Sequence, residues 1–155
     1  MPDEKRTASS QPPIRAEMIS DPRYLSAVRA LVGQFAARCG FNEHQCGQIA
    51  LAVDEAICNI INHGYQRRED GRIWLELWQQ VDPKGVKIVL EDEARQVDLE
   101  SIRSRDLDDI RPGGLGVHII REIMDEVEYA HRSGQGMRLT MSKARILTGS
   151  DDGAK

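Results

Sequence analysis

The chain has 155 residues, of which 40% are hydrophobic and 30% are charged, and its formal net charge is −4. This size predicts one domain with a real core, and the negative charge argues against a protein that binds nucleic acid directly. No apolar run approaches the roughly 18 residues that span a bilayer, and no apolar leader opens the chain, so we expect a cytoplasmic protein without a membrane contact. The three cysteines fit no zinc pattern and are expected to be reduced.

The first third of the chain predicts a polar lead-in, a strand and a helix. Residues 1–13 are polar and end in two prolines, which is typical of a disordered segment. Apolar and polar residues alternate over 14–19, which indicates a strand. A capping residue, Asp21, and a proline, Pro22, then predict the start of a helix that runs to about Arg38.

The stretch 49–66 predicts the helix around which the chain is organised. Asn42 caps this helix, which we expect to end near Tyr65. At about 100° per residue, one edge is apolar and a polar stripe spans an arc of roughly 60° beside it. The stripe consists of Glu55, Asn59, Asn62 and Gln66. A polar stripe on a helix is most often a solvated face, so its weight here depends on the motifs that follow.

A hairpin and a long irregular segment come next. Residues 72–92 alternate around a tight turn and predict two paired strands. Trp74 and Trp78 lie on the face opposite the apolar residues, so we expect a helix or a partner to cover them. Residues 91–113 lose periodicity, and a loop of this length in a small domain is usually functional or mobile.

The last part of the chain begins with a glycine-rich turn. Pro112-Gly113-Gly114-Leu115-Gly116 opens a helix expected over 115–124, and two further strands are expected over 126–130 and 137–143, before a polar tail over 148–155. Glycines at a helix start let a polyphosphate approach the free amides closely. A helix start that simply needs glycines is the plainer alternative.

These stretches, in this order, resemble the ATP-binding domain shared by gyrase, Hsp90, the sensor histidine kinases and MutL. They are most similar to its small bacterial regulatory branch, the anti-sigma-factor serine/threonine kinases. The resemblance covers roughly residues 14–145. It rests on Glu55-x-x-x-Asn59 with His63-Gly64-Tyr65, then Asp92, then Gly113-Gly114-Leu115-Gly116-Val117 with Met124-Asp125-Glu126-Val127.

The resemblance implies a fold and a set of site residues. The implied fold is an α/β two-layer sandwich of the histidine-kinase-like ATPase (Bergerat) type over residues 14–147, with a mixed, mainly antiparallel sheet and three helices on one face. Glu55 is the implied catalytic residue, Asn59 the implied Mg²⁺ ligand and Arg29 the implied partner contact. The implied ATP-binding residues are Asn59, Asn62, Asp92, Ala94, Gly113, Gly114, Leu115, Gly116, Val117 and Thr140. His63 is expected to pack near the helix end rather than to catalyse.

The resemblance also implies a function. The implied protein binds ATP and Mg²⁺, phosphorylates a serine or threonine of a small anti-anti-sigma protein with a STAS domain, sequesters a sigma factor in alternation, and forms a homodimer. The alternative is a partner-binding module on a lapsed ATPase fold. It is favoured by Ala94 and Gln96, where the family usually has glycines, and by Met137, where it often has threonine.

Overall fold

Five strands form one antiparallel sheet, in the order β1-β2-β3-β5-β4, in a computed structural model that describes residues 11–103 and 114–146. The strands are β1 (Ile14–Ile19), β2 (Arg72–Val81), β3 (Lys84–Asp92), β4 (Glu126–His131) and β5 (Met137–Ala144). The helical elements are the 3₁₀ turn η1 (Pro22–Tyr24), α1 (Leu25–Arg38), α2 (Glu43–Asn59), the π turn η2 (Ile60–Gly64), α3 (Leu99–Arg103) and α4 (Gly114–Ile123).

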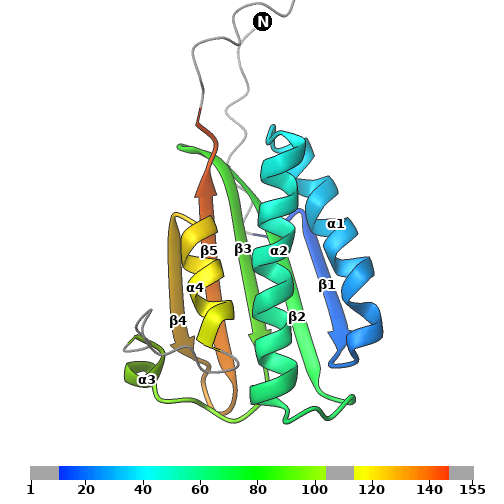
Figure 1. Ribbon diagram of the computed structural model, residues 1–155, viewed down its shortest axis with the longest axis vertical. Coiled ribbons are helices and arrows are strands. Elements are labelled where there is room, and N and C mark those ends of the chain that lie inside the picture. The colour runs from blue at the N-terminus through cyan, green and yellow to red at the C-terminus, as the bar shows by residue number, and fades with distance from the viewer. Residues whose placement is uncertain (1–10, 104–113, 147–155) are drawn as a thin grey trace, which may run out of the picture.

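Three helices, α1, α2 and α4, lie on one face of the sheet, and the described chain places no helix on the other face (Figure 1). The predicted two-layer sandwich is therefore confirmed. The prediction of a mainly antiparallel sheet is also confirmed, and every pairing between the described strands is antiparallel. The short helix α3 lies beyond the end of the sheet, near β4 (Figure 1).

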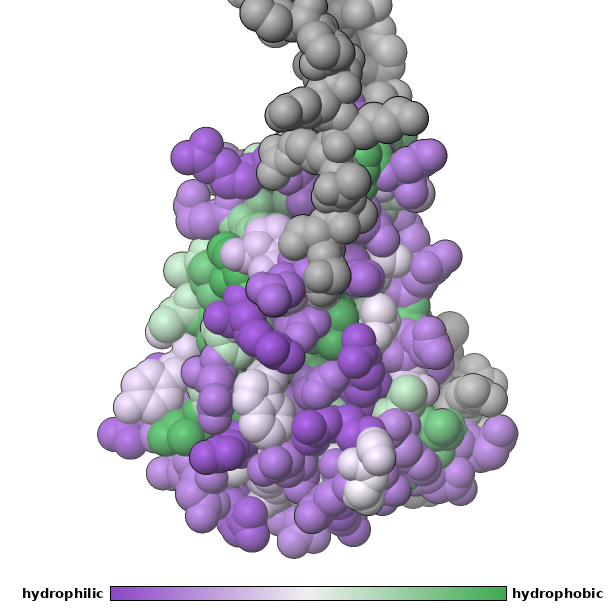
Figure 2. Space-filling model, turned by 180° about the vertical axis from the view of Figure 1, so that it is seen from behind, coloured by the Kyte–Doolittle hydropathy of each residue, from purple (hydrophilic) through white to green (hydrophobic). Residues whose placement is uncertain are grey.

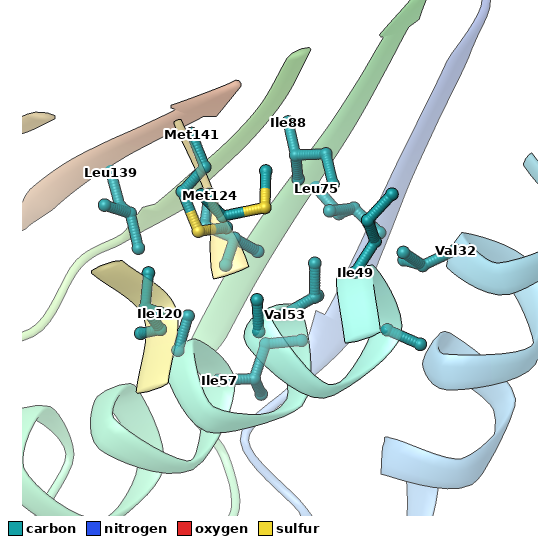
Figure 3. Close-up of a cluster of buried hydrophobic side chains, with 14 of the residues drawn as sticks. Val32, Ile49, Val53, Ile57, Leu75, Ile88, Ile120, Met124, Leu139 and Met141 are labelled. Atoms are coloured by element: carbon teal, nitrogen blue, oxygen red, sulfur yellow. The ribbon is translucent and has the colours of Figure 1, made fainter. Parts of the chain in front are cut away.

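The central helix α2 begins with a reciprocal capping box. The Asn42 side chain accepts from the Gln45 amide at 2.8 Å, and the Gln45 side chain accepts from the Asn42 amide at 3.0 Å. From there the apolar stripe points into the sheet, and Ile49, Val53 and Ile57 are each 0% exposed. Figure 3 shows this stripe between residues of the sheet and of α4. Burial of this stripe therefore sets which edge of α2 remains for polar side chains.

Where Figure 2 shows it uncovered, the face of the sheet opposite the helices is mostly hydrophilic, with smaller hydrophobic areas. We expected a helix or a partner over Trp74 and Trp78; among the described residues no helix covers them, and cations stack on both rings. The Arg132 guanidinium lies 4.9 Å from the centre of the Trp74 ring, and the Lys87 ammonium lies 4.6 Å from that of Trp78. The Trp78 indole also donates to Glu76 at 3.1 Å. The aromatic faces are thus partly covered by the chain's own charged side chains.

Some predictions fall on segments that the structure does not describe. The predicted lead-in and tail lie almost wholly outside the described residues, as do Pro112 and Gly113. Of the irregular segment after β3, the structure describes residues 93–103, which include α3. In the described ranges, no helix combines the length and hydrophobicity needed to cross a bilayer.

The buried stripe of α2 makes a stability prediction. Ile49→Ala removes a side chain that is 0% exposed and should lower the free energy of unfolding by about 2–5 kcal/mol. Leu51→Ala, on the same helix at 42% exposure, is the control and should change it by less than about 0.5 kcal/mol. Urea unfolding followed by circular dichroism measures both, and equal losses would contradict the packing of α2 described here.

Candidate functional site

A cavity opens between α2, the end of β3, β5 and the start of α4. Its walls are largely aliphatic and include Leu90, Val117 and Leu139. Two of its polar side chains are those of Asn59 and Asp92, from α2 and from the end of β3. An apolar cavity with a few convergent polar groups is the usual form of a small-molecule site.

The first turn of α4 packs directly on the polar stripe of α2. A Cβ atom placed on Gly116 would lie 2.8 Å from Glu55 Oε2 and 3.3 Å from Asn59 Nδ2. Any residue other than glycine at this position would displace one of these two side chains. The start of α4, with its free amides and the positive end of its dipole, therefore lies beside Glu55 and Asn59. This arrangement suits an anion, and above all a phosphate group.

The predicted glycine turn is only partly within the described chain. Gly114 begins α4, the side chain of Leu115 is 59% exposed, and Val117 is buried against the cavity. Gly113 lies outside the described residues. The structure therefore brings Gly116 and Val117 to the cavity, while Leu115 points away from the core.

Asp92 closes β3 and is 3% exposed. Its Oδ1 accepts from the amides of Ala94 at 2.9 Å and Met137 at 3.3 Å. Burial raises the pKa of this carboxyl above its ordinary value of 3.8, and the two backbone hydrogen bonds oppose that rise. Because both bonds reach Oδ1, Oδ2 is left to accept from a donor in the cavity. An amino group of a ligand is one donor that fits such an oxygen.

Two departures from the family pattern are accommodated by the surrounding chain. Ala94 is buried, and a Cβ atom placed on Gly64 would lie 3.0 Å from its methyl group, so Gly64 leaves the room that Ala94 fills. The Gln96 side chain donates to the carbonyls of Arg132 at 2.9 Å and Gly136 at 3.4 Å. It thereby ties the segment after β3 to the β4–β5 turn. Neither substitution blocks the cavity.

The end of α2 differs from the prediction. The helix widens into the π turn η2, in which the Tyr65 amide donates to the Ile60 carbonyl at 2.8 Å. A π turn holds more residues per turn than an α-helix, so the polar stripe reappears one residue later. Both side chains are exposed, but His63 lines the cavity and Asn62 does not. At α-helical spacing Asn62 lies on the stripe, whereas the π turn brings His63, which the quoted motif includes, to the cavity lining.

Thr140 is not brought to the cavity. On β5 the side chains of Met137, Leu139 and Met141 face the helices, and Met137 and Leu139 line the cavity. Thr140 pairs in register with Val89 and Glu128 and faces the other side of the sheet. Because side chains alternate along a strand, a residue next to Leu139 cannot share its face. Met137 thus stands where we expected a threonine to contribute.

Arg29 lies on the outer surface of α1, away from the cavity lining. Its Nε is 3.6 Å from Asp54 Oδ1, which is an ion pair but too long for a hydrogen bond. That Asp54 oxygen is buried and has no hydrogen-bond partner among the described residues. Arg29 therefore contacts α2 from the side of α1, whereas Glu55, the next residue after Asp54, faces α4.

The donor set fits a magnesium nucleotide. Asn59 offers one neutral amide oxygen, Glu55 offers a carboxylate one turn earlier, and both side chains are partly exposed. Magnesium takes few protein ligands and keeps several waters, which it shares with substrate phosphates. The apolar walls next to Asp92 suit a flat base with an exocyclic amine, so the residues present fit both parts of an adenine nucleotide.

Comparisons with known proteins agree with this geometry. The sequence model of the histidine kinase-like ATPase domain matches residues 18–143. Serine-protein kinase RsbW of Listeria monocytogenes is 29% identical over 135 residues, which cover 82% of this chain and 85% of that protein. The proteins of the same name from Oceanobacillus iheyensis and Staphylococcus aureus are 28% and 26% identical and cover 84% and 82% of this chain and 85% and 84% of their own lengths. Because the domain model spans most of the sequence, this chain belongs to the histidine kinase-like ATPase domain family.

Proposed function

We propose that this protein is an ATP-dependent serine/threonine kinase of the anti-sigma-factor type. It binds ATP with Mg²⁺, phosphorylates a small anti-anti-sigma protein with a STAS domain and, in alternation, sequesters a sigma factor. The observation that carries the proposal is the contact of Gly116 with Glu55 and Asn59, which puts a helix start, a carboxylate and an amide around one point. The relatives named serine-protein kinase RsbW support the choice of a protein hydroxyl as the acceptor.

Each residue has a role in the proposed reaction. Asp92 Oδ2 accepts from the exocyclic amine of adenine, and the amides at the start of α4 hold the phosphates. Asn59 supplies a magnesium ligand, and the chemistry that a bound magnesium ion adds is neutralisation of phosphate charge. Glu55 accepts the proton of the attacking hydroxyl while a bond forms from that oxygen to the terminal phosphorus. The bond from this phosphorus to the bridging oxygen breaks, and ADP leaves.

The partners are also part of the proposal. Arg29 is exposed on α1 and pairs with Asp54 of the helix that carries Glu55, so we expect it to contact a docked partner protein. We place the reaction in the cytoplasm and expect a homodimer that binds neither nucleic acid nor membrane.

A second candidate function is a partner-binding module without catalysis. One observation favours it, namely that Met137 presents an apolar side chain to the cavity where the resembled family often has a threonine. Replacement of Glu55 separates the two candidates, because only a kinase depends on this carboxylate.

Glu55→Gln should abolish phosphotransfer but leave ATP binding intact. Loss of a positioned general base lowers the rate by about 10²–10⁴-fold. Transfer of labelled phosphate to a cognate STAS-domain protein measures the rate, and calorimetry measures ATP binding. Glu43→Gln, at the exposed start of the same helix, is the control and should transfer at the wild-type rate. Transfer by Glu55→Gln at the wild-type rate would assign the base elsewhere.

Asn59→Ala should remove the magnesium dependence of ATP binding. Wild type should bind ATP more tightly with Mg²⁺ than without it, and the variant should bind equally under both conditions, since its metal ligand is gone. Asn62→Ala removes the same amide from the exposed side of the helix end and should behave as wild type. Calorimetric titration of the three proteins, with and without Mg²⁺, tests this. A variant that keeps the full magnesium effect would place the metal away from Asn59.

Asp92→Asn should weaken ATP binding without loss of stability. In the variant Oδ1 can still accept from the two amides, but an NH₂ group then faces the adenine amine, donor against donor. A hydrogen bond to a charged group is worth about 1.5–3 kcal/mol, so we expect the Kd for ATP to rise at least about tenfold. An unchanged Kd would mean that Asp92 does not bind the base.

The same substitution has a pH signature. Burial raises the pKa of Asp92 above 3.8, so the folded protein holds this proton more tightly than the unfolded chain does. That stabilisation is fully present below pH 3.8 and is lost as the pH rises through the folded pKa. Asp92→Asn has no such proton to lose. Its free energy of unfolding, measured with urea, should therefore increase relative to wild type as the pH rises from about 4 to about 7.

A further inference from the structure

The turn between β4 and β5 contains Arg132, which contacts Asp92 from the face of the sheet opposite the helices. The Arg132 amide donates to the Gly136 carbonyl at 3.0 Å and closes this turn. Gly136 has φ +95°, and a Cβ atom placed on it would lie 1.9 Å from the Asp92 carbonyl oxygen. Glycine at this position therefore lets the turn rest directly against the end of β3.

The Arg132 side chain leaves this turn along the open face of the sheet and makes three contacts. Its Nη1 donates to the Asp92 carbonyl at 2.8 Å, and its Nε lies 3.1 Å from Glu91 Oε2. Its guanidinium also stacks on Trp74 at 4.9 Å, and only 27% of the side chain is exposed. A guanidinium held on a ring and by a carboxylate keeps one orientation, so its remaining donor has a defined direction.

The hydrogen bond from Arg132 to the Asp92 carbonyl lies where the pairing of β3 with β5 ends. The ladder between β3 and β5 ends at the pair Glu91 and Arg138, so on that side Asp92 has no strand partner. The Arg132 guanidinium donates to the Asp92 carbonyl one residue beyond the last β3–β5 pair. The carboxylate of Asp92 projects from the same residue toward the helices and the cavity. The bond from Arg132 holds the backbone of Asp92 in place, and the two amide bonds to Oδ1 orient its carboxylate from that backbone.

We propose that Arg132 is a positioning residue for base recognition, which holds the Asp92 carboxylate in the orientation that selects a purine with an exocyclic amine. Arg132 does not line the cavity and acts only through Asp92. The inference rests on the proposed function, in which Asp92 accepts from that amine. It assigns a role in nucleotide selection to a side chain on the face of the sheet away from the nucleotide.

The test compares ATP with purine riboside triphosphate, which lacks the amine. Arg132→Met keeps an unbranched apolar stem against Trp74 and removes the guanidinium. Its affinity for ATP should fall by about tenfold, which corresponds to one hydrogen bond to a charged group, while its affinity for purine riboside triphosphate should stay at the wild-type value. Calorimetry with Mg²⁺ present gives both affinities, and urea unfolding confirms that the variant is folded. If Arg132→Met does not fold, Arg132→Lys serves instead, because one ammonium cannot reproduce the fork that reaches both Glu91 and Asp92.

Arg138→Met is the matched control. Arg138 has the same charge, lies on the same face of the sheet and pairs with the same carboxylate, with Nη1 2.9 Å from Glu91 Oε1. It makes no hydrogen bond to Asp92 in the described structure. We therefore expect Arg138→Met to keep the wild-type preference for ATP.

The outcomes separate the inference from the proposed function. An equal loss of affinity for both nucleotides in Arg132→Met would indicate a merely structural role and overturn the inference. An equal effect of the two arginine variants would assign the effect to the Glu91 ion pair and also overturn it. A wild-type preference for ATP that survives in Arg132→Met overturns the inference alone. Absence of any preference in wild type overturns the role proposed for Asp92 and the inference with it.

Discussion

The close approach of α4 to α2 is the constraint on which the site depends. A helix start can present free amides to a ligand only where no side chain intervenes, and Gly116 provides that gap against Glu55 and Asn59. The approach also requires α2 to turn its polar edge toward α4, which burial of Ile49, Val53 and Ile57 against the sheet enforces. The hydrophobic core and the polar site are therefore two consequences of one helix orientation.

The opposite end of the cavity is built by backbone contacts at the end of a strand. β3 extends to Asp92, while its pairing with β5 stops one residue earlier. The amides of Ala94 and Met137 reach the carboxylate, and Arg132 reaches the carbonyl. Burial of a carboxylate costs free energy unless hydrogen bonds compensate it, and these contacts supply that compensation. An apolar residue at this position would need no such contacts. Such a cost is typical of a residue kept for binding.

The open face of the sheet is covered by the chain's own charges. Arg132 and Lys87 stack on the two tryptophans, and Glu91 pairs with both Arg132 and Arg138. A face of this kind can remain in water without a third layer. Arg132 also bonds to Asp92, so the polar face and the candidate nucleotide site share one side chain. A substitution on this face is therefore expected to affect the nucleotide site as well.

The sequence by itself determined the five strands and the three long helices of the described chain, and one part of the site. Periodicity and capping predicted α2 and the hairpin, and spacing predicted that Glu55 and Asn59 share an edge, because these features depend on neighbours within one turn or one strand. Tertiary structure alone decided that a π turn brings His63 rather than Asn62 to the cavity and that Arg132 contacts the Asp92 carbonyl. These depend on which backbone bonds form and on contacts between segments some 40 residues apart, such as the bond from Arg132 to Asp92. No local pattern in the sequence encodes such contacts.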